Sequence, residues 1–303
     1  DNIHFVNPST STATITVKIA GSQVDSFQLH AGNSTYKSYP GVCNGPVQII
    51  SDQLIWVTQR VVGWNSFKEA PGLPADVATT EIYYTWYDMR YASWDAVHIL
   101  NPSETSSANI GVYIGSELKR TIGISPRGTT YLTFPGEIGG PVRIVSDIPI
   151  FSTQRVVGWS DFDEVVGLPT WYVFKEHWFT WYDLKSPDVQ IDNIHLINLG
   201  SADASIQVYV AGIQRASFML PAGGQTYTNF PGVIGGPLRI LSDQPIRVTQ
   251  RIVGWNGFKE EFSVPTELMS TKWYFNWYDK MNTQIDNIHF LNLGTSDAHV
   301  TVT

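Results

Sequence analysis

DNIHFVN at Asp1–Asn7 is the first of four copies of one block; the others are DAVHILN at Asp95–Asn101, DNIHLIN at Asp192–Asn198 and DNIHFLN at Asp286–Asn292. The steps between successive copies are 94, 97 and 94 residues. A fixed period is the signature of an array of similar structural units. A period of this length is that of a whole domain rather than of a solenoid repeat. The sequence therefore predicts tandem domains, arranged as beads on a string, each able to bury its own core.

Three further blocks follow in the same order within each copy. They are GPVQIISD, GPVRIVSD and GPLRILSD from Gly45, Gly140 and Gly236; TQRVVGW, TQRVVGW and TQRIVGW from Thr58, Thr153 and Thr249; and TWYD, TWYD and NWYD from Thr85, Thr180 and Asn276. Spacing is constant from the GP proline to WYD and varies between WYD and the next DNIH-type block. Because insertions collect in exposed connections, we place the boundaries directly before each DNIH-type block. The predicted repeats are 1–94, 95–191, 192–285 and an incomplete fourth, 286–303.

Short segments that alternate apolar and polar residues fill each copy, as in Ala13–Ile19 and Val24–Leu29. About seven such segments separated by turn residues are typical of an antiparallel β-sandwich. The sequence thus predicts an all-β protein of tandem immunoglobulin-like sandwiches with about seven strands each. No long helix is expected. A single helical turn is predicted at Ser66–Glu69 and at its counterparts Asp161–Glu164 and Gly257–Glu260.

Composition argues against several functions. Only 15% of residues are charged, the net charge is −8, and Lys and Arg form no runs, which disfavours nucleic-acid binding. No apolar stretch approaches the roughly 20 residues of a membrane helix. The motifs of hydrolases, metalloproteases, P-loop proteins and dinucleotide-binding enzymes are missing from the sequence, so no enzyme and no cofactor is expected.

Two sets of recurring tryptophans have two interpretations. The sets are Trp64, Trp159 and Trp255, and Trp86, Trp181 and Trp277. Packing in the cores or between domains is the interpretation we favour, because Trp buries a large area. Stacking on sugar rings is the alternative. The segment around Trp86 is aromatic on both strand faces, which predicts that a neighbouring domain covers it.

An arginine recurs inside an apolar strand of each copy, at Arg60, Arg155 and Arg251. An unpaired buried charge is costly, so each arginine needs a partner. Three acidic sets are candidates for this structural ion pair: Asp52, Asp147 and Asp243; the WYD aspartates Asp88, Asp183 and Asp279; and Glu69, Glu164 and Glu260 of an F-x-E motif. An exposed arginine that contacts a ligand is the alternative.

The recurring histidines and the single cysteine are predicted to be structural. His4, His98, His195 and His289 each follow the block's Asp by three residues, which in a strand places the two side chains on opposite faces, a poor geometry for one metal. We therefore favour hydrogen-bonded histidines, and leave a weak calcium site open because acidic residues recur. Cys43 matches Ile138 and Ile234, so it is expected to be a buried thiol.

The order of these blocks resembles that of tandem β-sandwich modules in secreted bacterial and archaeal cell-surface proteins. The elements in the third copy are Ala211-Gly212 to Leu220, Pro231-Gly232, Gly236–Asp243, Gln250-Arg251, Phe258–Glu260 and Trp273–Asp279. The resemblance covers nearly the whole chain, apart from the missing Gly-Leu before Pro265. It implies an extracellular, surface-attached protein with a structural or adhesive role and without catalytic residues.

Two functions follow as hypotheses. The first is a structural array within a filament, sheath, stalk or surface layer, with copies of the same protein as partners. The second is a carbohydrate-binding or adhesive module that binds surface glycans through the recurring Trp and Tyr residues. The fourth repeat, 286–303, holds only two predicted strands, which are marginal alone. Either the chain continues, or these strands are added to a neighbouring subunit.

Overall fold

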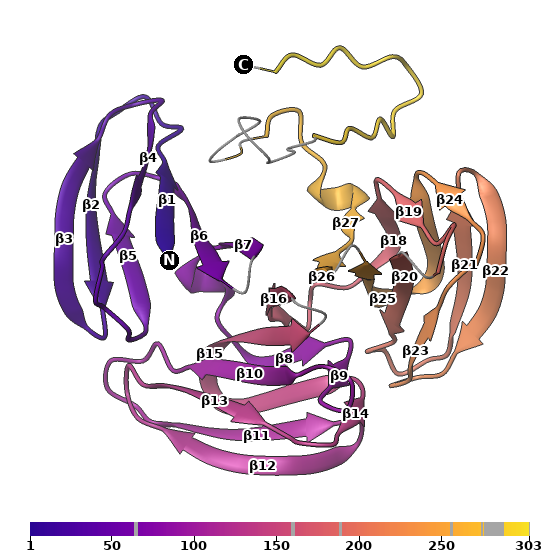
Figure 1. The fold of residues 1–303 in the computed structure, drawn as a ribbon, viewed down its shortest axis with the longest axis horizontal. Helices are drawn as coiled ribbons and strands as arrows, with labels where there is room; N and C mark the ends of the chain where they lie inside the picture. The colour runs from indigo at the N-terminus through magenta and orange to yellow at the C-terminus, as the bar shows by residue number, and fades with distance from the viewer. Residues whose placement is uncertain are drawn as a thin grey trace.

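The computed structural model describes residues 1–63, 66–158, 161–187, 190–254, 257–273, 275 and 288–302. Its sheets are antiparallel, so the predicted all-β class is confirmed (Figure 1). The helical elements of the described ranges are two 3-10 turns, η1 (Ala75–Val77) and η2 (Thr266–Leu268). Neither is long or apolar enough to cross a membrane.

The N-terminal unit consists of two sheets that enclose one core. Its strands are β1 (Asn2–Val6), β2 (Ala13–Ile19), β3 (Ser22–Leu29), β4 (Ser34–Lys37), β5 (Val47–Ser51), β6 (Trp56–Gly63) and β7 (Ser66–Pro71). One sheet has the order β4-β1-β6-β7 and the other the order β3-β2-β5. Alternating residues of both sheets, including Phe5, Ile15 and Val17, are fully buried between them.

The middle unit has the same two layers with additional strands. Its strands are β8 (Thr79–Tyr84), β9 (Tyr87–Asp88), β10 (Trp94–Leu100), β11 (Ala108–Ile114), β12 (Glu117–Ile124), β13 (Thr129–Thr133), β14 (Ile138–Gly139), β15 (Val142–Gly158), β16 (Asp161–Val166) and β17 (Leu168–Pro169). The long strand β15 runs through both layers: its first half pairs with β11 and β8, and its second half pairs with β10 and β16.

The C-terminal unit repeats the middle unit strand for strand. Its strands are β18 (Phe174–Phe179), β19 (Tyr182–Asp183), β20 (Gln190–Ile197), β21 (Ala204–Val210), β22 (Ile213–Leu220), β23 (Gln225–Thr228), β24 (Ile234–Gly235), β25 (Leu238–Gly254), β26 (Gly257–Phe262) and β27 (Val264–Pro265). β25 pairs with β21 and β18 along its first half and with β20 and β26 along its second. The middle and C-terminal units are therefore two repeated sandwich-like modules.

The sheets are offset from the sequence repeats. β8 and β9 lie within the predicted repeat 1–94, but they pair with β15 and β14 of the middle unit. β18 and β19 pair in the same way with β25 and β24. We call β8 and β18 closing strands, because each completes a sheet built mainly from the next repeat. The sheets thus begin at Thr79 and Phe174 rather than at Asp95 and Asp192, because the segment of variable length after WYD is a connection inside a unit.

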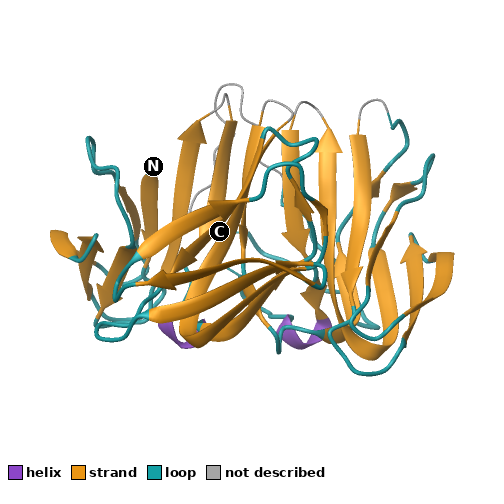
Figure 2. Cartoon of the chain, turned by 90° about the horizontal axis from the view of Figure 1, so that it is seen from below, coloured by secondary structure: helices purple, strands orange, loops and turns teal. Residues whose placement is uncertain are grey.

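The three units lie around a common centre, where strands β7, β16 and β26 meet (Figure 1). β16 packs against both β7 and β26. The strands of the units stand side by side when the molecule is viewed from the side (Figure 2). The prediction of helical turns at Ser66–Glu69, Asp161–Glu164 and Gly257–Glu260 is wrong. Each segment is a strand that pairs with the TQR strand directly before it, and this pairing overrides a short, ambiguous local pattern.

Cys43 is exposed, so the prediction of a buried thiol is wrong. Its counterpart Ile234, in the two-residue strand β24, is itself 44% exposed. The position lies at the rim of a sheet, and an apolar residue type at equivalent positions was not evidence of burial there.

Candidate functional site: the contacts between units

Each recurring arginine forms an ion pair with the F-x-E glutamate of the strand beside it. The distances are 2.8 Å from Arg60 Nη2 to Glu69 Oε2, 2.5 Å from Arg155 Nη2 to Glu164 Oε2 and 3.3 Å from Arg251 Nε to Glu260 Oε2. The two residues of each pair are direct cross-strand partners. The threonine two positions before the arginine lies on the same strand face and donates to the same carboxylate. Of the three candidate acidic sets, the structure therefore selects the glutamates.

The WYD aspartates have a different role from the one predicted. Asp88 Oδ1 accepts hydrogen bonds from the backbone N–H groups of Arg90 and Tyr91, at 3.0 and 2.9 Å. Asp183 Oδ1 accepts one from the N–H of Lys185. These carboxylates stabilise the turns after β9 and β19, as Asp side chains commonly do. The third, Asp279, lies outside the described residues.

The aspartate of the DNIH-type block pairs with the glutamine of TQR, which sequence reasoning missed. Asp95 is fully buried and accepts hydrogen bonds from Gln154 Nε2 at 2.8 Å and from the N–H of Asp88 at 2.8 Å. Asp192 has the equivalent partners, Gln250 and the N–H of Asp183. Burial raises the pKa of Asp95 to about 7, although these hydrogen bonds oppose the rise. The recurrence of both the Asp and the Gln in every copy was the available signal.

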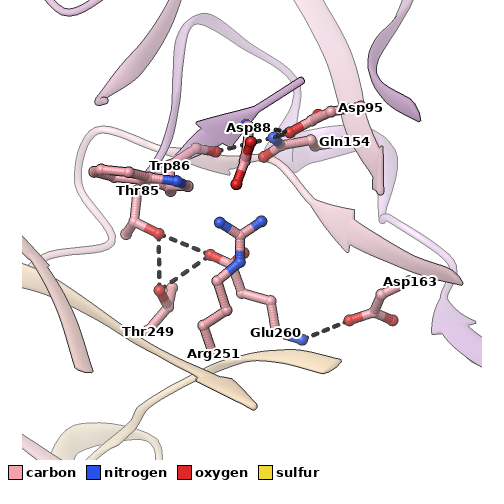
Figure 3. Close-up of polar contacts among 9 residues, drawn as sticks. All are labelled: Thr85, Trp86, Asp88, Asp95, Gln154, Asp163, Thr249, Arg251 and Glu260. Atoms are coloured by element: carbon pink, nitrogen blue, oxygen red, sulfur yellow. Dashed lines mark hydrogen bonds and ion pairs between the residues drawn. The ribbon is translucent and has the colours of Figure 1, made fainter. Parts of the chain in front are cut away.

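A shared polar cluster joins the middle and C-terminal units (Figure 3). Thr85 Oγ1, directly after β8, donates to Glu260 Oε1 at 2.7 Å and lies 2.8 Å from Thr249 Oγ1. Asp163 Oδ2 of β16 accepts a hydrogen bond from the N–H of Glu260 at 2.6 Å. The carboxylate that pairs with Arg251 is thus held from both units.

This cluster buries one arginine–glutamate pair more deeply than the others. The side chains of Arg251 and Glu260 are 6% and 1% exposed, whereas those of Arg155 and Glu164 are 22% and 16% exposed. Thr85 covers Glu260, and Figure 3 shows the Arg251 guanidinium directed toward Asp88 of the middle unit. Thr85 and Thr249 satisfy Oε1 of Glu260, whereas Oε2 of Glu260 and the Nε and Nη2 atoms of Arg251 are buried without a hydrogen-bond partner among the described residues. Mutual attraction therefore carries more of the cost of burying this pair than hydrogen bonds do.

A lysine at the centre of the molecule connects all three units. Lys68 Nζ of β7 lies 2.8 Å from Asp161 Oδ2 of β16 and donates to the carbonyl oxygen of Phe258 in β26 at 2.7 Å. Lys259 of β26 lies 3.6 Å from Asp163 of β16. The central strand carries acidic residues, DFDE, where its two neighbours carry SFKE and GFKE. This difference between otherwise similar copies makes the neighbouring strands complementary in charge.

Arg247 makes a further contact between units, which the sequence did not predict. Its side chain is buried in the C-terminal unit and donates to the backbone carbonyls of Tyr83 and Pro169, in the middle unit. Burial lowers its pKa to about 10, so the guanidinium stays charged at neutral pH. Its counterparts are Trp56 and Phe151, so the repeat pattern gave no signal for it.

Of the recurring tryptophans, the structure describes Trp86, which packs between units, and Trp181, which faces solvent. Trp86 lies edge-on to His195 and Tyr227 of the C-terminal unit, with ring centroids 5.3 and 5.8 Å apart. This contact agrees with the expected cover by a neighbouring domain. Trp181 is 47% exposed. Trp64, Trp159, Trp255 and Trp277 lie outside the described residues.

The histidines stack on tyrosines. His4 stacks on Tyr36, and His195 stacks on Tyr227, at 5.6 and 5.4 Å between centroids. Burial lowers the pKa of His195 well below its usual range, so the ring is neutral at pH 7. Among the residues that the structure describes, no three His, Cys, Asp or Glu side chains are arranged to hold a metal ion.

A shallow cavity of about 320 Å³ lies between the middle and C-terminal units. Tyr83 and Arg143 line one side of it, and Leu199 and Gln225 line the other. Neither Trp86 nor Trp181, the two recurring tryptophans that the structure describes, is among its lining residues. Comparison with protein-family models and with curated protein sequences finds no match for this chain.

Proposed function

We propose that this chain is a structural repeat array, part of an extracellular filament, sheath, stalk or surface layer, with copies of itself as partners. The observation that carries the proposal is the central contact of Lys68 with β16 and β26. A charged side chain that bridges three units opposes their independent movement, and a fixed orientation of units suits a load-bearing or lattice-forming role.

The charge pattern of the central strands supports this proposal. Lys on β7 and β26 faces Asp on β16, so the order of neighbouring units is encoded in the few positions where the copies differ. Charge complementarity contributes specificity more than affinity. An array in which each unit selects its neighbour is an assembly device, whereas a single catalytic or ligand site would not need it.

The proposal also covers the topology of the units, the location of the protein and its lack of catalytic activity. We assign each unit an immunoglobulin-like topology of about seven strands, not counting the two-residue strands of the middle and C-terminal units, together with a location outside the cell and no catalytic activity. Support comes from the paired layers of each unit and from the resemblance to secreted surface modules described above. Many cell-surface domains share this sandwich architecture.

Glycan binding is the second candidate, and one observation favours it. Tyr227 is 52% exposed beside the ring of Trp86, and Trp181 is 47% exposed. Aromatic faces at a surface suit the apolar side of a sugar ring. The same residues serve packing between units equally well, so this function ranks second.

Electron microscopy of the native material, with the intact mass of its polypeptide, tests the first function. Regular filaments or sheets are expected, and dispersed single chains would contradict a structural polymer. A glycan array probed with the purified chain tests the second function. Binding that is lost in Trp181→Ala and retained in Val62→Ala, another exposed apolar residue, would favour an adhesin.

A further inference from the structure

The cavity between the middle and C-terminal units has the size of a small-molecule site. Its volume of about 320 Å³ lies within the range of ligand pockets, roughly 300–1,000 Å³. Its walls include strands β8 and β15 of the middle unit and strand β23 of the C-terminal unit, each paired within its own sheet. Ligand sites occur preferentially where two folded units meet, as this cavity does.

The wall on the C-terminal unit carries a polar atom without a partner. Gln225 Oε1 is buried and has no hydrogen-bond partner among the residues that the structure describes. A buried acceptor that lacks a donor is unfavourable, and native structures contain few of them. Because Gln225 lines the cavity, a hydroxyl group of a molecule held there would supply the missing donor.

The wall on the middle unit supplies hydrogen-bond donors. Arg143 Nε donates to Glu81 Oε1 at 2.5 Å, and the hydroxyl of Tyr83 donates to the same oxygen at 3.0 Å. A guanidinium group has five N–H donors, so this ion pair leaves donors for another molecule. The Arg143 side chain is 41% exposed, and its guanidinium lies over the ring of Tyr113, 5.4 Å from the centroid, which restricts its orientation.

The lining as a whole suits an uncharged ligand. Among the described residues that line the cavity, only Arg143 is charged, and Glu81 balances its charge. Pro141, Leu199 and the ring of Tyr83 contribute apolar surface between the polar groups. A matching ligand has hydroxyl groups, which both donate and accept hydrogen bonds, on an apolar frame. A neutral sugar has this chemistry.

An aromatic side chain extends the site beyond the cavity. Tyr227 lies two residues after Gln225 on the same face of β23, about 7 Å further along the strand. Its ring stacks on His195 at 5.4 Å between centroids and meets the Trp86 ring edge to face at 5.8 Å. These neighbours hold the ring in place, although Tyr227 remains 52% exposed. A fixed aromatic face beside a polar cavity suits the apolar side of a second sugar ring, because little freedom is lost on binding.

The junction between the N-terminal and middle units shows that this lining is not a general property of the repeat. The residues that replace Gly223 and Gln225 there are Arg127 and Thr129, so the amide is missing and a long side chain stands where the cavity has glycine. Tyr131, which matches the tyrosine beside the cavity, is exposed to a similar degree, 56%. The two junctions therefore share the exposed tyrosine but differ in the lining, and this difference provides matched controls.

We propose that the cavity and Tyr227 together bind a neutral saccharide, with one sugar ring between Gln225 and Arg143 and the next ring on Tyr227. Hydroxyl groups of the first ring donate to Gln225 Oε1 and accept from the Arg143 guanidinium. Because the walls belong to two units, the bound sugar bridges them. This inference rests on the second candidate function, glycan binding, and gives that function a site that does not involve Trp181.

Saturation-transfer NMR titration of the full chain measures this binding. The sugars are cellobiose, maltose and diacetylchitobiose, which are neutral, with digalacturonate as the anionic comparison. A dissociation constant of about 10 mM or tighter is expected for at least one neutral disaccharide. Digalacturonate should bind severalfold more weakly, because the lining carries no net positive charge. No binding of any neutral disaccharide at about 50 mM would overturn the proposal, and so would equal or tighter binding of digalacturonate.

Two substitutions and a control test the residues. Gln225→Leu removes the amide at similar side-chain size and should weaken binding at least about tenfold. Tyr227→Ala should weaken it by about threefold or more, because the second ring loses its aromatic face. Tyr131→Ala, at the other junction, removes an equally exposed tyrosine and should leave the affinity unchanged. Equal affinities of wild type and Gln225→Leu would overturn the proposal, and thermal unfolding shows whether each variant is folded.

A third variant fills the cavity instead of removing a contact. Gly223→Arg introduces the residue of the other junction, where Arg127 adopts a similar backbone conformation, with φ 55° against 66° at Gly223. A Cβ at Gly223 meets no atom within 4 Å, so the larger side chain has room, and binding should be lost. If a glycan array instead shows binding that depends on Trp181 and not on Gln225 or Gly223, glycan binding stands and this site is wrong.

Discussion

The junction between the middle and C-terminal units and the junction between the N-terminal and middle units use equivalent residues, but they differ in what covers them. At the junction between the middle and C-terminal units, Thr85 directly follows a closing strand and donates a hydrogen bond to Glu260. The side chain of Glu260 is 1% exposed there. At the second, Glu164 keeps its arginine and its threonine but remains 16% exposed. The same ion pair therefore joins neighbouring strands in both places, and at the first junction Thr85 also makes it an inter-unit contact; no such contact is seen at the second among the described residues.

The largest expected effect comes from removing the charge of the glutamate at each junction. Glu260→Gln leaves the buried Arg251 without a counter-charge and should lower the free energy of unfolding by about 3–5 kcal/mol. Glu164→Gln should cost about 1–2 kcal/mol, because water reaches Arg155. Guanidinium denaturation measures both, together with amide hydrogen exchange of the β25–β26 hairpin for Glu260→Gln and of the β15–β16 hairpin for Glu164→Gln. Equal losses would show that the closing strand does not deepen the pair.

The pH dependence of the free energy of unfolding tests the junction between the middle and C-terminal units through Asp95, which lies beside it. Its pKa is about 7 in the folded protein against about 4 when unfolded. The folded state therefore binds more protons between these values, and this group makes stability fall as pH rises from about 4 to 7, by as much as about 4 kcal/mol. Below pH 4 and above pH 7 its contribution is constant.

Asp95→Asn should remove this decline, and the measurement is the difference in unfolding free energy between wild type and variant at each pH. Taking the difference cancels the opposite trend of the buried histidines, whose lowered pKa values favour stability at higher pH. Asp192→Asn is a parallel variant rather than a control: its carboxylate has the equivalent partners and burial raises its pKa too, so it should also reduce the decline. Parallel pH curves for wild type and Asp95→Asn would contradict the prediction.

The sequence could predict those features that depend on local alternation of apolar and polar residues, and not those that depend on which strands meet. Alternation over Ala13–Ile19 depends on one residue pointing in and the next pointing out, and the observed strand β2 has these bounds. The offset of the sheets could not be read in this way, because a strand pattern at Thr79–Tyr84 does not say which sheet it joins. The partner of each arginine could not be chosen from the sequence for the same reason, because Glu69, Asp52 and Asp88 all lie close enough to Arg60 along the chain to be candidates.

The sequence indicates the polar contacts between units less clearly than it indicates the strands, and only some of these contacts could be predicted from it. Lys68, Asp163 and Lys259 occupy one repeat position with alternating charge, which is what complementary neighbouring strands require. The contact of Arg247 could not be predicted from such a charge pattern, because its counterparts Trp56 and Phe151 are aromatic. A contact made by a position that differs in every copy can be found only in the folded molecule.

Removal of the central lysine should have an intermediate effect. Lys68→Met loses an ion pair with the buried Asp161 and a hydrogen bond to Phe258, and should cost about 2–3 kcal/mol. Lys259→Met is the matched control and should cost less than about 1 kcal/mol, because its ion pair is long and its side chain is 39% exposed. Thermal unfolding measures both. A larger loss in Lys259→Met would contradict the role of Lys68 as the bridge between units.

The smallest expected effect comes from exchanging one closing-strand contact between the two complete units. In the C-terminal unit His177 Nδ1 lies 2.6 Å from Ser263 Oγ, and in the middle unit the equivalent residues are Ile82 and Gly167. A Cβ at Gly167 would lie 2.6 Å from Ile82 Cγ2, so isoleucine at this position requires glycine opposite it. His177→Ile should therefore cost about 1–3 kcal/mol through overpacking against Ser263, and adding Ser263→Gly should recover most of the loss.

The same exchange predicts a change in acid sensitivity. Burial lowers the pKa of His177 to about 4, so its contribution to stability is complete above about pH 6.5 and is lost as pH falls toward 4. The double variant His177→Ile/Ser263→Gly should lose less stability than wild type over that range, as measured by thermal unfolding at pH 7 and pH 5. A double variant as unstable as the single one would mean that the two closing strands sit in different surroundings despite their common register.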